Sequence, residues 1–310
     1  MIELNGVSKS FGTVQALRDV SFSVPTGSVC ALLGHNGAGK TTAVNILSTL
    51  LRPTSGEARV GGFDVVRQPD EVRANIGVTG QDASLDIWLT GRENLVLFSR
   101  LRGLKRKEAR RRADELIEQF DLVRAADRQV HTYSGGMRRR IDIAASLVVA
   151  PKVLFLDEPT TGLDPRSRRD VWSLVTDLVD QNVTVLLTTQ YLEEADVLSD
   201  SIVILNGGQV VASGTSEELK GLMGVAYCQV TPVSPDDLSR IAGVLTDFDD
   251  VEIDPDLNTV SVPAVQGVST LGEVFRRIEQ LDVELLDISL RKPSLDEVFL
   301  HLTEPAATKT

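Results

Sequence analysis

Cysteine is scarce in this sequence, where Cys30 and Cys228 are the two thiols in 310 residues. Cys30 lies in an apolar run and Cys228 far from it, so two buried, reduced side chains fit better than a disulfide or a metal pair. Long apolar runs are also missing, and none approaches the roughly 18 residues of a membrane-spanning helix. The first six residues lack the basic start and apolar middle of a secretory signal. We therefore expect a protein that stays in the cytoplasm.

A basic surplus is absent as well, because the net charge is -12. Residues 1–214 carry 25 Lys and Arg against 26 Asp and Glu, whereas residues 215–310 carry 7 against 18. This shift predicts a domain boundary, and so acidic a chain is a poor candidate for non-specific nucleic-acid binding. Eight Lys and Arg do gather between Arg100 and Arg112, which would suit nucleic acid or an anionic lipid surface. Since they lie off the apolar stripe of the expected helix, a solvated helix face is the better interpretation.

The stretch from Val29 to Leu51 carries the clearest chemical signal. An apolar run leads into Gly34-His35-Asn36-Gly37-Ala38-Gly39-Lys40-Thr41-Thr42, and a helix-period run follows as far as Leu51. A strand, the pattern G-x-x-x-x-G-K-S/T and a helix together form a phosphate-binding loop. Its glycines let backbone N–H groups surround phosphate oxygens at the N-terminus of the helix. Lys40 would bridge the terminal phosphates, and the Thr41 hydroxyl would bind Mg2+.

Two carboxylates, Asp157 and Glu158, follow the apolar run 153–156. We expect a buried parallel strand that delivers both acids at its C-terminal edge. In a nucleotide site, Asp157 would hold the water shell of the metal, and Glu158 would orient or deprotonate the attacking water. Exposed acids after a strand are a common alternative, but the phosphate-binding loop on the same chain favours the functional interpretation.

Three further signals are ambiguous from residue context alone. Ser134-Gly135-Gly136 before a helical run could form a second anion site or a plain N-cap with a glycine turn. Phe11 could stack on an adenine, although a phenylalanine next to a turn is more often a packing residue. Gln81 stands at the end of a predicted strand and means little by itself.

The order of the elements predicts an α/β fold. Strands expected at 29–33, 76–78, 153–156 and 183–187 alternate with helices, which favours a mostly parallel sheet with its sites at the strand C-termini. Expected strands at 2–4 and 16–24, and a hairpin around Asn206-Gly207-Gly208, add antiparallel strands. Residues 222–303 mix helix and strand patterns in the manner of a small α+β domain, and we expect 304–310 to be a frayed, disordered tail.

In combination, these motifs resemble the nucleotide-binding subunit of ABC transporters over roughly residues 1–218. The loop at 34–41 resembles the Walker A motif, 153–158 the Walker B motif with its catalytic glutamate, and 134–136 the signature motif. Gln81 is similar to the Q-loop glutamine, and Leu163-Asp164 to the D-loop. The resemblance implies a P-loop ABC ATPase domain at 1–218 with a helical subdomain at about 88–150, followed by an accessory or regulatory domain at 222–303.

The family roles carry over position by position. The implied ATP-binding residues are Phe11, Gly34, Asn36, Gly37, Ala38, Gly39, Lys40, Thr41, Thr42 and Gln81, with Phe11 stacking on the adenine. The implied Mg2+ ligands are Thr41, Gln81 and Asp157, and the implied catalytic residues are Glu158, Gln190 and Lys40. Asp164 belongs to the D-loop. Ser134, Gly135 and Gly136 would bind in trans the ATP held by a second copy.

This sequence departs from the family pattern in two places. Tyr133 and Met137 replace the usual Leu and Gln around the Ser-Gly-Gly core, from which we expect little loss, because the backbone and the serine do most of the phosphate binding. Gln190 stands where most members carry a histidine that contacts the terminal phosphate. An amide can donate a hydrogen bond but cannot be a cation. We therefore expect Gln190 to contact the γ-phosphate of ATP but not to supply the positive charge of a protonated histidine. Slow ATP turnover would be compatible with this difference.

The Tyr-Ser-Gly-Gly-Met-Arg-Arg-Arg form and the segment 293–299 resemble the daunorubicin-resistance type of drug-exporter ATPase. This resemblance implies that ATP hydrolysis powers the export of drugs or other amphiphilic small molecules. It also implies a homodimer, a separately encoded transmembrane permease, no nucleic-acid partner, and a peripheral location on the cytoplasmic side of the membrane. The competing interpretations are a soluble ABC ATPase in a non-transport role and a non-hydrolysing ATP-dependent regulator. A polysaccharide exporter subunit would instead be expected to carry an all-β extra domain.

Overall fold

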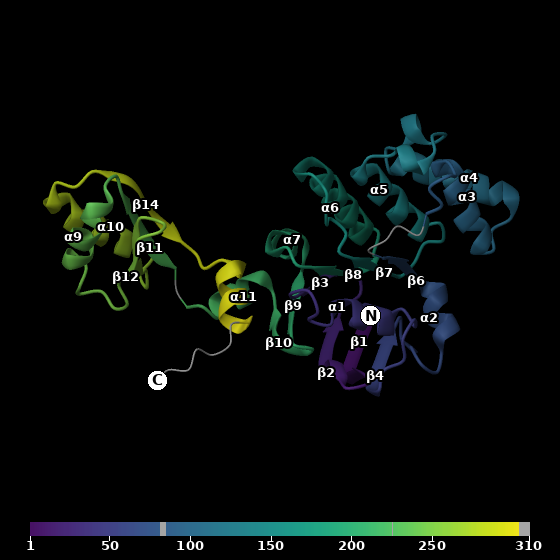
Figure 1. The fold of residues 1–310 in the computed structure, drawn as a ribbon, viewed down its shortest axis with the longest axis horizontal. Coiled ribbons are helices and arrows are strands. Elements are labelled where there is room, and N and C mark those ends of the chain that lie inside the picture. The colour runs from purple at the N-terminus through teal and green to yellow at the C-terminus, as the bar shows by residue number, and fades with distance from the viewer. Residues whose placement is uncertain (81–84, 225, 304–310) are drawn as a thin grey trace. The chain divides into compact units, whose positions relative to one another are not determined.

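The computed structural model describes residues 1–80, 85–224 and 226–303 (Figure 1). Contacts divide the chain into two compact units, residues 1–216 and 217–310. The expected tail at 304–310 and the expected Q-loop residue Gln81 lie outside the described residues. None of the described helices combines the length and the apolar character that crossing a membrane requires.

The first unit is built on a six-stranded sheet in the order β10-β9-β3-β8-β7-β6. Its strands are β3 (Val29–Leu33), β6 (Ile76–Thr79), β7 (Val153–Asp157), β8 (Thr184–Thr189), β9 (Ser201–Asn206) and β10 (Gln209–Gly214). Neighbours from β9 to β6 pair in parallel, and β10 pairs antiparallel with β9 across the predicted Gly207-Gly208 turn. The strands β3, β7 and β8 are buried along their whole length, as parallel strands covered on both faces are. The predicted, mostly parallel α/β sheet is confirmed.

A second, antiparallel sheet has the order β2-β1-β4-β5. Its strands are β1 (Ile2–Phe11), β2 (Val14–Val24), β4 (Ser55–Val60) and β5 (Phe63–Asp64). The first strand runs well past the predicted end at Leu4, because it pairs with β2 as far as Phe11 and Val14. Buried side chains of this sheet, of β3 and of α1 (Lys40–Leu47) share one apolar core.

The helix α1 is shorter than the sequence predicts, and its expected continuation to Leu51 is wrong. Ser48 is its C-cap, and Thr49 adopts a left-handed conformation with φ at 68°. The N–H groups of Leu50 and Leu51 both bond the carbonyl of Asn45, at 2.8 and 2.9 Å. Both bonds turn the chain back onto one helical carbonyl group, that of Asn45, and the helix ends about one turn before Leu51.

The remaining helices of the first unit flank the larger sheet (Figure 1). They are α2 (Pro69–Asn75), α3 (Gly91–Leu101), α4 (Arg106–Gln119), α5 (Gly135–Ser146), α6 (Pro165–Asp180) and α7 (Leu192–Leu198); two short 3-10 turns, Val123–Ala125 and Val130–Thr132, precede α5. The helix α8 (Ser216–Gly221) begins at the last residue of the first unit and otherwise belongs to the second. On α4 the apolar side chains from Ala109 to Ile117 are buried, whereas Arg106, Arg110 and Arg111 are exposed. The basic stretch is therefore an exposed helix face.

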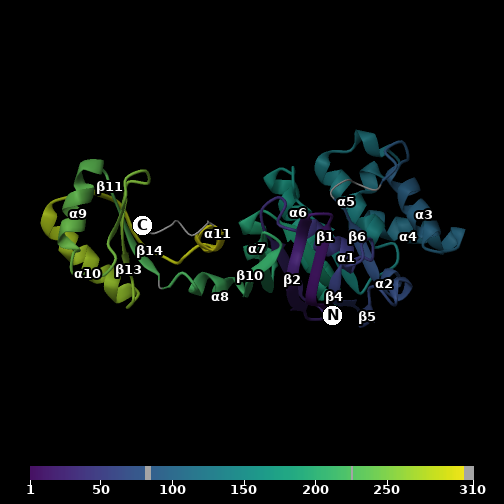
Figure 2. The same cartoon turned by 60° about the horizontal axis from the view of Figure 1, so that its bottom comes forward.

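The second unit contains a four-stranded antiparallel sheet in the order β12-β13-β11-β14. Its elements are β11 (Tyr227–Pro232), a 3-10 turn (Pro235–Asp237), α9 (Leu238–Val244), β12 (Glu252–Asp254), β13 (Thr259–Pro263), α10 (Val268–Ile278), a 3-10 turn (Glu279–Leu281), β14 (Leu285–Arg291) and α11 (Leu295–Thr303). This β-α-β-β-α-β order is the split βαβ arrangement. The helices α9 and α10 cover one face of the sheet (Figure 2), where Cys228, Val230, Val260 and Val262 are buried against them. The predicted small α+β fold is confirmed.

Candidate functional site

Two glycines of the loop between β3 and α1, Gly34 and Gly39, have no room for a Cβ atom. A Cβ atom on Gly34 would lie 2.5 Å from the carbonyl oxygen of Leu205. Gly39 has φ at 107°, and a Cβ atom there would lie 2.7 Å from the carbonyl oxygen of Ala16. The backbone can therefore pass close to its neighbours and turn sharply into α1.

The N-terminus of α1 has free capacity for an anion. Gly39 is its N-cap, and within the described part of the chain no side chain caps it. The N–H groups of the first helical turn have no acceptor inside the helix. Together with the helix dipole, they suit a negatively charged group such as a phosphate.

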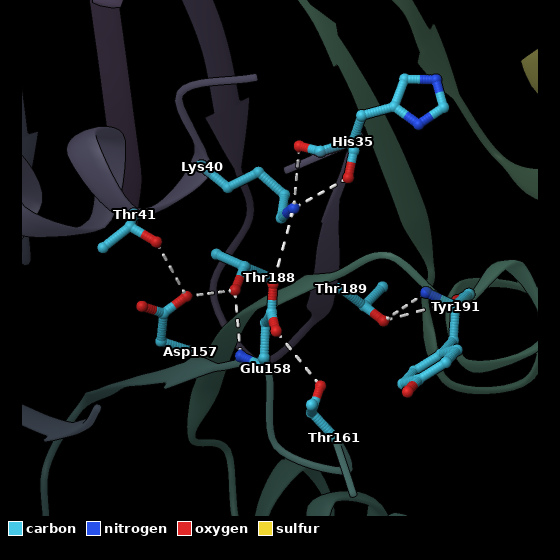
Figure 3. A network of polar contacts seen from close by, with 10 residues as sticks. His35, Lys40, Thr41, Asp157, Glu158, Thr161, Thr188, Thr189 and Tyr191 are labelled. Atoms are coloured by element: carbon cyan, nitrogen blue, oxygen red, sulfur yellow. Dashed lines mark hydrogen bonds and ion pairs between the residues drawn. The ribbon is translucent and has the colours of Figure 1, made fainter. Parts of the chain in front are cut away.

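Lys40 points back under the loop (Figure 3). Its Nζ donates hydrogen bonds to the carbonyl oxygens of Gly34 at 2.8 Å and of His35 at 3.2 Å, and lies 3.6 Å from Glu158 Oε1. The residue is 4% exposed. Burial lowers the pKa of Lys40, while the nearby charges of Glu158 and Asp157 oppose this shift. Two carbonyl oxygens and the Glu158 carboxylate thus surround the Lys40 amino group at the centre of the loop.

Asp157 is the last residue of β7, and three oxygen-bearing side chains meet there. Its Oδ1 lies 3.5 Å from the Thr41 hydroxyl and accepts a hydrogen bond from the Thr188 hydroxyl on the neighbouring β8 (Figure 3). The parallel pairing of β7 with β8 places Asp157 opposite Thr188. The sequence pattern did not single out Thr188, because a threonine in a buried strand is an ordinary β-branched residue.

Glu158 occupies a strained backbone position. Its φ is 48°, in the left-handed region that non-glycine residues rarely adopt. The strain is supported by hydrogen bonds from its N–H group to the carbonyl oxygen of Thr188 at 3.1 Å and to its hydroxyl at 3.0 Å. The carboxylate accepts a further hydrogen bond from the Thr161 hydroxyl at 3.2 Å. Strain of this kind gathers at functional sites, and here it directs the carboxylate towards Lys40.

A pocket of about 570 Å³ unites several of the predicted ATP-binding residues. It is lined by Phe11, Ala16, His35, Asn36, Gly37, Gly39, Lys40, Thr41, Thr42 and Glu158. The structure thus brings Phe11 next to the loop, although it lies 23 positions before Gly34 in the chain. Phe11 is 47% exposed, and the Lys9 ammonium lies 5.1 Å from the centre of its ring. Gly34 and Ala38 support the loop from behind, because Ala38 is buried and Gly34 packs against it.

Other predicted residues lie outside the lining of this pocket. Ser134 is the exposed N-cap of α5, and its hydroxyl accepts a hydrogen bond from the Met137 N–H at 3.3 Å. Gly135 and Gly136 form the first turn of that helix, and a Cβ atom on Gly136 would lie 2.4 Å from Ser167 Oγ. Asp164 is the N-cap of α6 and accepts hydrogen bonds from the N–H groups of Arg166 and Ser167. These residues are not gathered around the phosphate loop of their own chain.

Gln190 is exposed directly after the buried strand β8. The turn that follows is fixed by Thr189, whose hydroxyl accepts a hydrogen bond from the Tyr191 N–H at 2.9 Å (Figure 3). The chain therefore presents Gln190 at the same C-terminal edge of the sheet as Asp157 and Glu158.

Arg139 is a residue of this region that the sequence pattern did not reveal. Its guanidinium, on α5, donates hydrogen bonds to the carbonyl oxygens of Gly80 at 3.0 Å and Asp157 at 3.2 Å, and pairs with Asp142 at 3.3 Å. Burial lowers the pKa of Arg139, whereas Asp142, Glu194 and Asp157 raise it. In the sequence it is one arginine in a run of three, which reads as a helix surface.

Comparison with known proteins identifies the family. Residues 17–161 match the family model described as ABC transporter. The doxorubicin resistance ATP-binding protein DrrA of Mycobacterium tuberculosis is 52% identical over 97% of this chain and 93% of its own length. The daunorubicin/doxorubicin resistance ATP-binding protein DrrA of Streptomyces peucetius is 48% identical over 97% of this chain and 92% of its own length.

Solved structures agree with the sequence relatives. A dimeric ATP-binding cassette in a post-hydrolysis state, bound to ADP and Pi, is 28% identical with a TM-score of 0.63, over 69% of this chain and 98% of that one. A nucleotide-free cassette from an ABC transporter is 25% identical with a TM-score of 0.66, over 72% of this chain and 94% of that one. The predicted ABC ATPase fold and the resemblance to the drug-resistance type are confirmed, and the two competing interpretations are not favoured. The chain belongs to the ATPases of the ABC transporter family, in the group of daunorubicin and doxorubicin resistance ATP-binding proteins.

Proposed function

We propose that this chain hydrolyses ATP to power the export of drugs or other amphiphilic small molecules through a separately encoded permease. The convergence of Lys40, Asp157 and Glu158 at one edge of the sheet carries the chemical part of this proposal. The names of the relatives, which are drug-resistance ATP-binding proteins, support the choice of cargo.

ATP binds in the pocket beside the loop. The phosphates lie against the N–H groups of residues 36–42 and the N-terminus of α1, and the adenine stacks on the exposed ring of Phe11. Lys40 exchanges its contacts with the carbonyl oxygens of Gly34 and His35 for phosphate oxygens. The charge that the loop already holds thereby becomes the charge that binds the terminal phosphates.

Thr41 in the first turn of α1 and Asp157 at the end of β7 fit a Mg2+ ion. The Thr41 hydroxyl and the Asp157 carboxylate are hard oxygen ligands within 3.5 Å of each other. Within the described ranges, there is no cluster of three or more His, Cys, Asp or Glu side chains of the kind that holds a metal ion by protein ligands alone. At Thr41 and Asp157, phosphate oxygens and water would complete the coordination shell of Mg2+. When bound, Mg2+ neutralises phosphate charge. Gln81 stays a proposed third ligand.

Glu158 is the proposed general base that orients the attacking water. Its carboxylate is fixed by the Thr161 hydroxyl and by a backbone held to Thr188. Gln190 donates an amide hydrogen bond to the terminal phosphate but supplies no positive charge. We therefore propose slower turnover than a histidine at this position would support.

Two copies of the chain complete each site. Ser134, Gly135 and Gly136 are proposed to bind the terminal phosphate of the ATP held by the partner subunit. Their position outside the pocket of their own chain supports this arrangement, as does the dimeric state of the related cassette with ADP and Pi. The D-loop residue Asp164 accepts a hydrogen bond from the Ser167 hydroxyl, and that hydroxyl lies next to Gly136. Asp164 would therefore help to fix the surface formed by Ser134, Gly135 and Gly136.

A groove of about 320 Å³ on the first unit is the proposed docking site of the permease. Its lining includes Leu50 and Val78, which are 70% and 37% exposed, together with Ile76, Phe98 and Arg102. The lining residue Val78 lies three positions before Gln81, so a bound permease would be linked to the site through the Q-loop. This contact would hold the chain at the cytoplasmic face of the membrane.

Residues 1–218 are proposed as the catalytic domain, with a helical subdomain at about 88–150, and residues 222–303 as an accessory domain. The separate core of the second unit and its acidic composition support such a division. We propose that the accessory domain strengthens dimerisation or regulates assembly. Deletion of 222–310 should then change the dimer fraction or the ATPase rate, and unchanged values of both would refute this role.

The experiment for the proposed function compares the wild type with Glu158→Gln, each purified alone and together with the proposed permease. The wild type should hydrolyse ATP, faster with permease and drug present, whereas Glu158→Gln should bind ATP and turn over at least about a hundredfold more slowly. A wild type without turnover even in the presence of the permease would refute the proposal. ATP-dependent uptake of a fluorescent amphiphile into inverted membrane vesicles tests transport directly.

A further inference from the structure

A buried carboxyl group stands behind the site, on α7. Glu194 is 0% exposed. Its Oε1 accepts a hydrogen bond from the Thr160 hydroxyl at 2.9 Å and another from Trp172 Nε1 at 3.2 Å. Thr160 belongs to the loop after β7 and Trp172 to α6, so three segments of the chain meet at one oxygen atom.

The other oxygen of Glu194 is less well satisfied. Oε2 is buried and makes no hydrogen bond of ordinary length and angle with any residue that the structure describes. Burial raises the pKa of Glu194, while hydrogen bonding from Thr189, Thr160 and Trp172 and the charge of Arg168 oppose the rise. An unsatisfied buried oxygen costs about 1 to 3 kcal/mol. The two hydrogen bonds at Oε1 offset this cost and fix the carboxyl group between Thr160 and Trp172.

The contacts of Glu194 lead to two residues of the site. Thr160 lies two positions after Glu158, in the loop whose Thr161 hydroxyl bonds the Glu158 carboxylate. Gln190 lies four positions before Glu194, separated from it by the start of α7 at Leu192. The Arg168 guanidinium on α6 also lies 5.0 Å from the centre of the Tyr191 ring, directly after Gln190. Glu194 and its neighbours on α6 thus support two segments at the edge of the sheet. One is the loop after β7 that contains Glu158, and the other is the turn after β8 that contains Gln190.

We propose that Glu194 is a positioning residue for ATP hydrolysis, which holds the loop of Glu158 in register with the turn of Gln190 through its hydrogen bond with Thr160. The inference rests on the proposed role of Glu158. Glu194 lies outside the pocket lining and has no direct part in binding ATP. Its loss should therefore lower kcat and leave the affinity for nucleotide unchanged.

Four variants test this role. Glu194→Ala removes the acceptor, and Thr160→Val removes only the donor from the loop at nearly constant shape. Glu194→Gln keeps an acceptor oxygen for both donors, and Trp172→Phe removes only the donor from α6. We expect Glu194→Ala and Thr160→Val to lower kcat about tenfold or more, because small displacements of catalytic groups carry such costs. KM for ATP and the affinity for a fluorescent ATP analogue should stay within about twofold of the wild type.

Glu194→Gln should restore kcat to within about threefold of the wild type, and Trp172→Phe should resemble the wild type. Thermal unfolding identifies variants that fail to fold. If Glu194→Ala is one of them, the kcat of Thr160→Val tests the positioning role. A wild-type kcat in Thr160→Val, or equal losses in Thr160→Val and Trp172→Phe, would overturn the inference. The wild type and Glu158→Gln are measured in parallel. A wild type without turnover refutes the proposed function, and normal turnover by Glu158→Gln refutes the proposed role of Glu158, on which the inference rests. An active wild type and an inactive Glu158→Gln beside a fully active Thr160→Val refute the positioning role alone.

Discussion

Arg139 on α5 donates a hydrogen bond to the backbone carbonyl oxygen of Asp157, the last residue of β7, at 3.2 Å. The same guanidinium bonds the carbonyl oxygen of Gly80 and pairs with Asp142. One largely enclosed side chain, 10% exposed, thereby ties the helix that begins beside Ser134 to the ends of two strands at the site.

Replacement of Arg139 by leucine should destabilise the first unit by about 3 kcal/mol, because it breaks a buried ion pair and two hydrogen bonds to backbone carbonyls. Urea denaturation followed by circular dichroism measures the loss. Arg111→Leu is the matched control. The Arg111 side chain is 78% exposed and, among the residues that the structure describes, pairs only with Glu115 on the same helix, so a change within about 0.5 kcal/mol is expected. Equal effects of the two changes would contradict the structural role of Arg139.

Lys40→Ala should abolish measurable ATP binding and raise the apparent Kd at least about a hundredfold. Lys40 holds the positive charge at the centre of the loop, and its removal leaves Glu158 to repel the phosphates. Equilibrium binding of a fluorescent ATP analogue measures the change. Lys152 is exposed and outside the pocket lining, so Lys152→Ala should bind like the wild type. If Lys40→Ala kept the wild-type affinity for ATP, the phosphates would have to bind at a site other than this loop.

Ser134→Arg should spare ATP binding by the monomer and reduce turnover by at least about a hundredfold, because an arginine side chain at this exposed position would obstruct the closed dimer. Binding is measured at low protein concentration and turnover at high concentration. A mixture with the Glu158→Gln subunit locates the defect, since each dimer then contains at most one intact composite site. If an isolated Ser134→Arg monomer hydrolysed ATP at the wild-type rate, the shared-site proposal would be wrong.

Cys30 should make stability depend on pH in the alkaline range. Burial in β3 raises the pKa of its thiol from 9.0 to about 11, although a hydrogen bond with Ser201 opposes the shift. The unfolded chain loses this proton first, so the contribution of Cys30 to stability is complete below about pH 8.5 and declines as the pH rises towards 11. Urea denaturation at several pH values, compared with Cys30→Ala, isolates the effect. A stability difference between the two proteins that stays constant from pH 8 to 10.5 would contradict it.

The sequence determined the parts of the molecule that depend on local pattern. The apolar run before Gly34 and the two carboxylates after 153–156 predicted buried strands with chemistry at their ends, because parallel strands are apolar throughout and deliver polar groups at one edge. The paired glycines at 207 and 208 predicted the β9–β10 hairpin, where both have positive φ. The end of α1 was not predictable, because the left-handed Thr49 and the bonds to Asn45 reflect packing rather than residue type.

Only the tertiary structure decided how distant residues combine. The fold brings Phe11 to the phosphate loop and places Thr188 beside Asp157. It also places Arg139 and Glu194 behind the strand ends that carry Asp157 and Glu158. A threonine in a strand or an arginine on a helix has the same local pattern on the surface as in the interior. Its role depends on partners that lie tens of residues away in the chain. The sequence by itself therefore determined the phosphate-binding chemistry of the loop and its family, and the fold decided which side chains hold that loop and its carboxylates in place.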